Sequence, residues 1–453
     1  MTTRADIVIC GAGIAGVAAA YHLAVRHGMH DVVIVDDRDP LTLTSEKGTQ
    51  GYRNWWPGPD DTMLRFVTRS IDLLEELADE TNNLFRLNRR GYLFVTAEDV
   101  GVERLRAAAR QVSDFGMGAV REHPGATPYL PAPAEGFHDQ PIGADLLLGD
   151  EASHAFPFLS RTTKAALHVR RAGWMNALAL GAWMLKQSAA VGVTFVRDRV
   201  SAIDTTGGRV SRVRLASGAS IDTNRVVLAT GPMLPETGRM LGLELPLFHE
   251  LHAKVTFRDT HGVVPRSAPF TIWIDPMQLA FTPGEHSALG DDHTARHLLD
   301  TFPGGVHVRP VDGIHGSELF FIWTYHTERC APSWPPTYDR HYGEACLRGL
   351  TAMVPGMSSY LNRAERGFVD GGYYCKTTDN RPLIGPLPVE GAYVIGALSG
   401  TGIMTSQSAA DLLAAHLTHG PLPDYASAFL PSRYDDPAYV EQAFRWGALT
   451  GQL

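Results

Sequence analysis

The chain has few cysteines and no long apolar run. Its four cysteines are spread over 453 residues, with neither a C-x-x-C pair nor the spacing of a zinc site. Isolated thiols of this kind favour a reducing compartment, so we expect a cytoplasmic location. No apolar stretch is long enough to cross a bilayer, and the first motif begins too near the N-terminus to leave room for a signal peptide. These shortages argue against a secreted or membrane-spanning protein.

Positive charge is also scarce. Lysine and arginine total 40 against 49 aspartates and glutamates, which gives a formal net charge of −9. No basic block offsets this balance, so we expect no nucleic-acid partner. Hydrophobic residues make up 44% and charged residues 20%, as in an ordinary globular protein. The length allows two or three domains with separate cores.

Residues 6–37 carry the strongest local signal. The apolar run Ile7-Val8-Ile9-Cys10 predicts a buried parallel strand, and Gly11, Gly13 and Gly16 follow at G-x-G-x-x-G spacing. A predicted helix and a second buried strand come next, and that strand ends at Asp36. In such a unit the glycines make a tight turn, let the backbone approach a pyrophosphate and let the helix pack closely, while the acid accepts ribose hydroxyls. This order predicts a dinucleotide site, which could hold NAD or FAD.

Two further turns of small residues follow apolar strands. Val226-Val227-Leu228 leads into Ala229-Thr230-Gly231, and a later strand leads into Ser399-Gly400-Thr401-Gly402. The second turn precedes a predicted helix over 406–417, whose N-terminal end would favour negative charge on a ligand. Between the two turns, strands rich in aromatic residues predict an antiparallel sheet in a separate domain.

Taken together, these features resemble the D-amino-acid-oxidase superfamily of flavoproteins, which includes sarcosine oxidase, glycine oxidase and the dimethylglycine and sarcosine dehydrogenases. The likeness rests on the unit that ends at Asp36, the segment 44–53, the turn 229–231, and the segment 378–385 together with the turn 399–402. The resemblance implies an α/β fold (α+β overall), with a Rossmann-like FAD-binding domain assembled from split segments. It also implies an antiparallel β-sheet substrate domain that caps the flavin.

We expect the following division of the chain. The FAD-binding domain takes residues 1–90, 150–240 and 366–420, and the substrate or cap domain takes 91–149 and 241–365. Residues 421–453 form a C-terminal tail to which the sequence assigns no task. The resemblance implies FAD as the cofactor, and the expected cofactor-binding residues are Gly11, Gly13, Ile14, Ala15, Gly16, Asp36, Asp37, Thr44, Lys47, Gln50, Gly51, Val200, Thr230, Gly231, Gly400, Thr401, Gly402, Ile403 and Met404.

The positions at which family members attach flavin covalently are altered here. Dimethylglycine dehydrogenase-like chains use a histidine after the second strand, and by spacing Gln50 occupies that place. Sarcosine oxidases use a cysteine ahead of the T-x-D motif; counting back from Asp379 leads to Gly372, while Cys375 lies three residues later. We therefore expect noncovalent FAD, with Cys375 as the alternative attachment point.

Residues that hold substrate in the family are also partly replaced. Arg53 falls within one position of the arginine that binds the substrate carboxylate in sarcosine oxidase, whereas Met404 replaces its lysine. Tyr374 stands where glycine oxidase-like chains have an arginine. Sarcosine oxidases also place a lysine over the flavin shortly before a Tyr-His-Thr segment, but residues 320–323 before Tyr325-His326-Thr327 contain none. This absence weakens the oxidase assignment and leaves room for a dehydrogenase with another electron acceptor.

We expect an enzyme that oxidises a C–N bond of a small amine or amino-acid-like substrate by hydride transfer to flavin, with O2 or another electron acceptor. The candidate catalytic residues are Arg53, Tyr374, Tyr325 and His252. Tyr325 shares a strand face with Phe321 and Trp323, and this aromatic face either lines the substrate pocket or packs within the sheet. Two alternatives remain open: an FAD-dependent 2-hydroxy-acid dehydrogenase, and a flavin-binding subunit of a larger complex with 421–453 as its interface.

Overall fold

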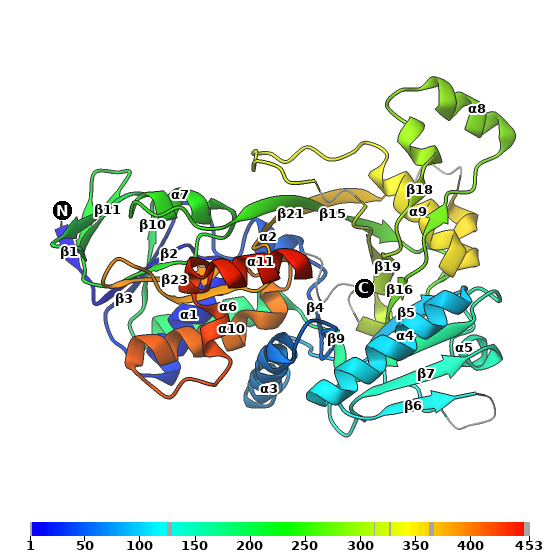
Figure 1. The fold of residues 1–453 in the computed structure, drawn as a ribbon, viewed down its shortest axis with the longest axis horizontal. Helices are drawn as coiled ribbons and strands as arrows, with labels where there is room; N and C mark the ends of the chain where they lie inside the picture. The colour runs from blue at the N-terminus through cyan, green and yellow to red at the C-terminus, as the bar shows by residue number, and fades with distance from the viewer. Residues whose placement is uncertain (1, 125–128, 312, 326–327, 362–366, 448–453) are drawn as a thin grey trace.

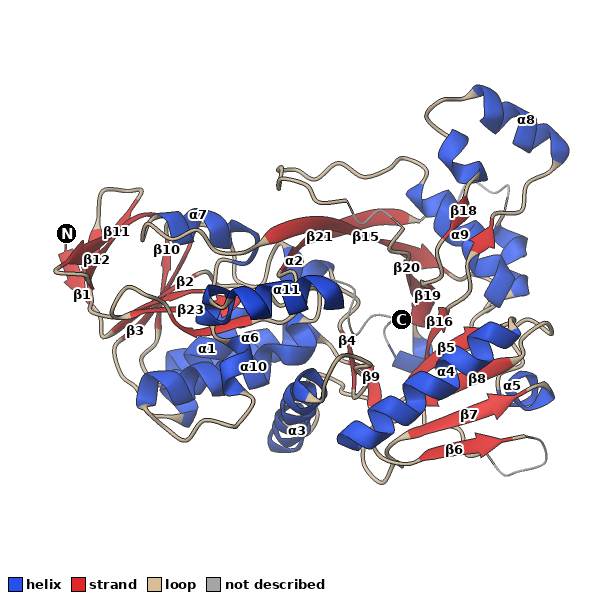
Figure 2. Cartoon of the chain, viewed as in Figure 1, coloured by secondary structure: helices blue, strands red, loops and turns tan. Residues whose placement is uncertain are grey.

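Two large sheets lie at opposite ends of the molecule, and a long pair of strands connects them (Figure 1). The strands of this pair are β15 (Phe248–Arg258) and β21 (Phe368–Lys376), which are antiparallel neighbours (Figure 2). The mixed arrangement of helices and sheets confirms the predicted fold class. This computed structural model describes residues 2–124, 129–311, 313–325, 328–361 and 367–447; His326, Thr327 and the end of the predicted tail lie outside them. Within those ranges no helix has the length and apolar character needed to span a membrane.

The first sheet is assembled from N-terminal, middle and C-terminal parts of the chain. It is parallel except for its last strand. In spatial order its strands are β10 (Thr194–Arg197), β3 (Val32–Asp36), β2 (Ile7–Cys10), β14 (Val226–Leu228), β23 (Ala392–Gly396) and β22 (Leu383–Pro386).

Both faces of this sheet are covered, which explains the unbroken apolar run of β2. Ile7 and Ile9 point into a core shared with the helices, whereas Val8 and Cys10 point into a second core on the other face. The helices are α1 (Ile14–Tyr21), α6 (Ala177–Ala190), α10 (Gly402–Thr418) and α3 (Thr62–Glu80). The other face packs on a four-stranded sheet of β1 (Thr2–Arg4), β13 (Ser220–Asp222), β12 (Arg209–Leu215) and β11 (Val200–Thr206).

The second large sheet has nine strands and is mostly antiparallel. After β21 and β15 its strands are, in order, β20 (Glu318–Ile322), β19 (Val306–Pro310), β16 (Phe270–Trp273), β5 (Tyr92–Thr96), β8 (Ala165–Val169), β7 (Ala144–Leu148) and β6 (Val120–His123). Strand β8 joins this sheet, although we expected residues 150–240 in the nucleotide domain, because the chain first returns to pair with β5 and β7. The two-stranded unit of β4 (Gly51–Arg53) and β9 (Ala172–Trp174) follows it in the chain.

The aromatic face of β20 packs as sheet core. The strand ends at Ile322 rather than at the expected residue 325, and Phe321 and Trp323 are fully buried beside helix α9 (Tyr342–Met353). Gly349 of α9 lies so close that a Cβ there would overlap the Trp323 ring. Of the two alternatives for this face, packing within the sheet is the one observed.

The C-terminal tail bonds to the segment 378–385. Its helix α11 (Pro437–Trp446) and the residues before it surround the buried carboxylate of Asp379. Arg433 Nε donates to Asp379 at 2.9 Å, and the hydroxyls of Tyr434 and Tyr439 donate at 2.7 and 2.6 Å. Burial alone would raise the pKa of Asp379, but the charge and hydrogen bonds of Arg433, with those of the two tyrosines, lower it to about 2.

Removing the arginine tests how strongly this buried pair stabilises the fold. Arg433→Met leaves a buried carboxylate without its counter-charge, so we expect a loss of about 3–5 kcal/mol in the free energy of unfolding in urea. Arg445→Met is the matched control, because the pair of Arg445 with Glu441 is exposed and such pairs contribute about 1 kcal/mol or less. Equal small losses in both variants would contradict the structural role of Arg433.

The same pair predicts a pH dependence. The pKa of Asp379 is lower in the folded chain than the value of about 3.9 expected for an unfolded chain. Its contribution to stability is therefore complete above that unfolded value and is lost as the pH falls towards 2. The difference in unfolding free energy between the wild type and Arg433→Met should shrink as the pH falls through this range.

Candidate cofactor and active site

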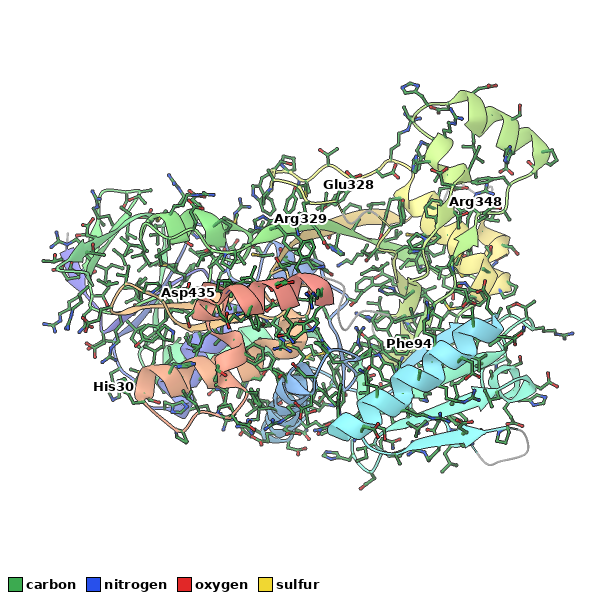
Figure 3. All side chains as sticks on the ribbon, in the orientation of Figure 1. His30, Phe94, Glu328, Arg329, Arg348 and Asp435 are labelled. Carbon is green, nitrogen blue, oxygen red and sulfur yellow. The ribbon has the colours of Figure 1, made fainter. Side chains whose placement is uncertain are left out.

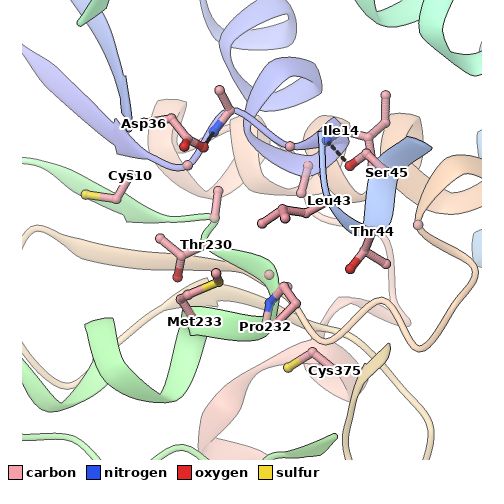
Figure 4. Close-up of a pocket in the computed structure, with 18 of the residues that line it drawn as sticks. Cys10, Ile14, Asp36, Leu43, Thr44, Ser45, Thr230, Pro232, Met233 and Cys375 are labelled. Carbon is pink, nitrogen blue, oxygen red and sulfur yellow. Dashed lines mark hydrogen bonds between the residues drawn. The ribbon is translucent and has the colours of Figure 1, made fainter. Parts of the chain in front are cut away.

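A cavity of about 390 Å³ opens at the carboxyl ends of β2, β3 and β14 (Figure 4). Its walls come from the turn after β2, the end of β3, the segment 41–48, the turn 229–233 and the turn 396–403, with a stretch of β21. Ligands of open parallel sheets bind at this edge, outside the carboxyl ends of the strands. The position of the cavity therefore suits a dinucleotide.

Gly11 and Gly16 are required by close backbone packing, and Gly13 leaves the cavity open. Gly11 has a φ of +106°, and a Cβ there would lie 2.5 Å from the carbonyl oxygen of Ala229. A Cβ on Gly16 would overlap the carbonyl oxygen of Gly11. At Gly13 the nearest atom to an added Cβ would be the Ser45 hydroxyl oxygen, at 3.3 Å. Backbone amides at this turn can thus approach a phosphate without hindrance.

Asp36 and Ser45 fix the two sides of the turn (Figure 4). The Asp36 carboxylate accepts hydrogen bonds from the backbone N–H of Ala12 at 2.7 Å and of Arg38 at 3.0 Å. The Ser45 hydroxyl accepts from the N–H of Ile14 at 3.0 Å. Ser45 belongs to the short helix α2 (Thr44–Lys47) and was not among the predicted site residues, because no spacing rule links it to the first turn of α1.

Many of the predicted cofactor residues line this cavity: Gly11, Gly13, Ile14, Ala15, Asp36, Asp37, Thr44, Val200, Thr230, Gly231, Gly400, Gly402 and Ile403. Several described residues that we also predicted do not line it: Gly16, Lys47, Gln50, Gly51, Thr401 and Met404. Of the predicted catalytic residues, Tyr374 lines the cavity, and Arg53, Tyr325 and His252 do not.

The predicted residues outside the cavity have other contacts. Lys47 pairs with Glu46 at 2.6 Å and with Asp370 at 3.2 Å. Gln50 Oε1 accepts from the N–H of Ala177 at 3.4 Å, whereas Gly48 of the same segment lines the cavity.

Cys375 lines the cavity but is a poor nucleophile. Burial raises the pKa of its thiol to about 12, so the thiolate, which is the reactive form, is scarce at neutral pH. Gly48 and Gly372 carry no side chain that could form a bond. A Cβ on Gly372 would lie 3.1 Å from the Cα of Thr44, so strand β21 and helix α2 approach closely here.

Tyr374 connects the cavity to a buried chain of charged groups. Its ring stacks on His252 with 3.8 Å between centroids, and Gly400 lies so close to the ring that a Cβ there would overlap it. His252 Nε2 lies 2.9 Å from Glu250 Oε2, to which Lys376 Nζ donates at 3.1 Å. Burial lowers the pKa values of His252 and Lys376 and raises that of Tyr374 to about 12, so the tyrosine hydroxyl stays neutral.

Three cations lie where the segment 46–53 meets the nine-stranded sheet. The guanidinium of Arg53 lies over the Tyr92 ring at 5.4 Å, and both Lys254 and Arg309 lie over the Phe320 ring, at 4.6 and 4.7 Å. Arg309 Nε donates to the carbonyl of residue 49, and Lys254 Nζ to that of residue 46. Burial lowers the pKa values of Arg53 and Lys254. The backbone N–H of Arg53 also donates to the Met404 sulfur of α10 at 3.2 Å.

Strand β15 supplies a lysine that β20 lacks. The register pairs Val255 with Phe321, which places Lys254 of β15 beside Ile322 of β20. Tyr325, by contrast, packs behind the sheet, where its ring stacks on Tyr342 at 5.6 Å and its hydroxyl donates to Asp339 at 3.2 Å.

The chain matches the family model described as FAD dependent oxidoreductase (DAO) over residues 6–416. Dimethylglycine dehydrogenase, mitochondrial, from Rattus norvegicus is 25% identical over 445 residues, covering 95% of this chain and 45% of that protein. The Homo sapiens counterpart is 28% identical over 446 residues, covering 95% and 44%. This chain thus spans about half the length of the curated relatives it matches.

Solved structures share the fold at low identity. L-proline dehydrogenase from P. horikoshii has a TM-score of 0.74 and 18% identity, covering 96% of this chain and 99% of that one. Glycine oxidase from Geobacillus kaustophilus has a TM-score of 0.71 and 17% identity, covering 95% and 99%. Iminodiacetate oxidase from Chelativorans sp. BNC1 has a TM-score of 0.68 and 20% identity, covering 94% and 99%.

The family match extends from strand β2 to helix α10 and so includes the strands and turns that shape the cavity. The glycine turn, the Asp36 carboxylate and the open backbone at Gly13 fit FAD, the cofactor of this family. The chain therefore belongs to the DAO family of FAD-dependent oxidoreductases.

Proposed function

We propose that this chain oxidises a C–N bond of an amine or amino-acid-like substrate that carries a carboxylate. The supporting observation is the cluster of Arg53, Lys254 and Arg309 where the segment 46–53 meets the nine-stranded sheet. Arg53 is bonded through its backbone to Met404 in the first turn of α10, the helix that begins at the cavity. The similarity to dimethylglycine dehydrogenase and glycine oxidase is consistent with such a substrate.

The cations would have two effects on the bound substrate. An arginine binds a carboxylate through paired hydrogen bonds, which orients the rest of the molecule. Neighbouring positive charges also lower the pKa of the substrate's ammonium group, so the amine loses its proton and binds neutral. FAD, when bound, supplies the acceptor for the hydride that leaves the carbon next to nitrogen. A protein base is then not required, and the imine product is hydrolysed by water.

A second candidate function is a flavin-binding part of a larger assembly. It is favoured by the length of the curated relatives, of which this chain matches less than half. The tail 421–453 would then serve as an interface. Turnover of an amine by the isolated chain at ordinary rates would exclude this candidate.

A substrate panel under nitrogen tests the proposed reaction. Loss of flavin absorbance is followed with N-methyl amino acids, free amino acids, 2-hydroxy acids, and amines that match the acids but lack the carboxylate. We expect reduction by one or more carboxylate-bearing amines, and at least about 100-fold slower reduction by the counterparts without a carboxylate, because the buried cations then lose their partner. Reduction by 2-hydroxy acids alone would replace the proposal with the hydroxy-acid alternative.

Substitution of Arg53 tests its role in binding the carboxylate. Arg53→Met should lower kcat/KM for an acidic amine by about 100-fold or more, which is about 3 kcal/mol, while FAD content is retained because Arg53 does not line the cavity. Arg212→Met is the matched control, since Arg212 pairs with Asp222 on the exposed four-stranded sheet. Equal loss of FAD and activity in Arg53→Met would refute the role in substrate binding.

The noncovalent attachment of FAD is tested by acid precipitation. We expect the flavin in the supernatant, because Gly48 and Gly372 carry no reactive side chain and the thiol of Cys375 is protonated. Cys375→Ser should behave in the same way. Yellow colour retained in the wild-type pellet and lost in the Cys375→Ser pellet would show a covalent bond to this cysteine.

A further inference from the structure

A segment of the nine-stranded sheet's domain crosses to the cofactor cavity. Residues 328–338, here called the strap, run between strand β20 and helix α9 and lie above β15 and β21; Figure 3 labels Glu328 and Arg329 at its start. Arg329 is bridged to Glu250 of β15, and its guanidinium lies 4.0 Å from the centre of the Phe248 ring. The N–H of Cys330 donates to the carbonyl of residue 249 at 2.9 Å. The start of the strap is therefore held on β15.

The middle of the strap is held on β21. The N–H of Ser333 donates to the Tyr373 hydroxyl at 3.0 Å, and that hydroxyl donates to the Ser333 carbonyl at 3.1 Å. The Tyr338 hydroxyl donates to the carbonyl of Gly371 at 3.0 Å. A single side chain, that of the lining residue Tyr373, thus closes a local ring of hydrogen bonds with the strap.

Trp334 extends from this anchor to the opposite wall. It lines the cavity, and it is the one described lining residue between 241 and 372. Its ring meets Tyr373 edge-on at 5.2 Å, and the guanidinium of Arg38 lies over it at 5.3 Å. Arg38 lies two residues beyond the end of β3, and its backbone N–H donates to Asp36. The indole therefore bridges the two sides of the cavity, with 36% of its surface exposed.

We propose that Trp334 forms the outer wall of the FAD site and retains the noncovalently bound cofactor. The inference uses the FAD cofactor of the family and is independent of the substrate proposed above. An indole that spans the two walls shields the cofactor from water, and the Arg38 contact holds the ring in place. FAD can leave only after the contact of Trp334 with Arg38 is broken, so the tryptophan acts mainly on the rate of release.

The test is the rate of FAD release from the holoenzyme, followed by the rise in flavin fluorescence after dilution. Trp334→Ala should release FAD about 10-fold faster or more, whereas Trp334→Phe should keep most of the retention. Phe368→Ala is the matched control, because Phe368 lies on the same strand as Tyr373 but is 69% exposed and does not line the cavity. An unchanged release rate in Trp334→Ala overturns the proposal.

A second variant tests the hydrogen bonds that hold the strap on β21 and leaves Trp334 itself unchanged. Tyr373→Phe keeps the ring in the cavity wall but removes the hydroxyl that holds Ser333. We expect faster release in this variant, and a double variant with Trp334→Ala that is less than additive, because both changes act through the same contact. Fully additive effects would show that Trp334 acts independently of the hydrogen bonds made by Tyr373, and would overturn this part of the proposal.

Variants that purify without FAD are still informative. The apo chain is titrated with FAD, and a dissociation constant at least about 10-fold above that of the wild type supports the retention role. A normal constant overturns it. Failure of the wild type itself to bind FAD would instead contradict the cofactor, so the two failures are distinguishable. Circular dichroism spectra that match the wild type establish that each variant is folded.

Discussion

Close packing of two backbone turns governs the architecture of the site. The turn after β2 lies directly on the turn after β14, and neither Gly11 nor Gly16 has room for a Cβ. The two turns cannot separate without breaking the parallel pairing of β2 and β14, which holds them together at the floor of the cavity. The Asp36 carboxylate and the Ser45 hydroxyl then hold the backbone of this turn from both sides. The segments around the cavity depend on this contact for their positions.

Charge is distributed unevenly between the two halves of the molecule. The floor presents backbone amides and a carboxylate, whereas Arg53, Lys254 and Arg309 lie against aromatic rings where the segment 46–53 meets the nine-stranded sheet. Carboxylates accompany the cations of this sheet: Asp370 stands opposite Lys254 in the β15–β21 register, and Glu250 is bonded to Lys376 and His252. Tyr374 lies between these halves, stacked on His252 and pressed against Gly400. A change at the sheet can therefore reach the cofactor site through one ring.

Whether the sequence could predict an interaction depends on how far apart its residues lie along the chain. The glycine turn and the acid at the end of β3 are local, so spacing alone reveals them. Two other contacts join residues far apart in the chain, and no periodicity in the sequence encodes them. Ser45 accepts a hydrogen bond from the N–H of Ile14, and Trp334 lines a cavity that is otherwise built from distant segments. Alternation along β20 correctly grouped its aromatic residues but could not show that this face packs on α9. Spacing across the irregular segment 44–53 also could not show that Gly48 lines the cavity and Gln50 does not.

The split sheet also constrains the order in which the protein can form on the ribosome. Strand β2 is made first, yet one neighbour, β14, emerges more than 200 residues later, and β23 only after residue 392. The last groups that surround Asp379 come from residues 433–439. Since domains normally fold as they leave the ribosome, strand β2 stays without its β14 neighbour until residues 226–228 have emerged. Cofactor capture is thereby postponed until the turn 396–403, which completes the cavity, has been made.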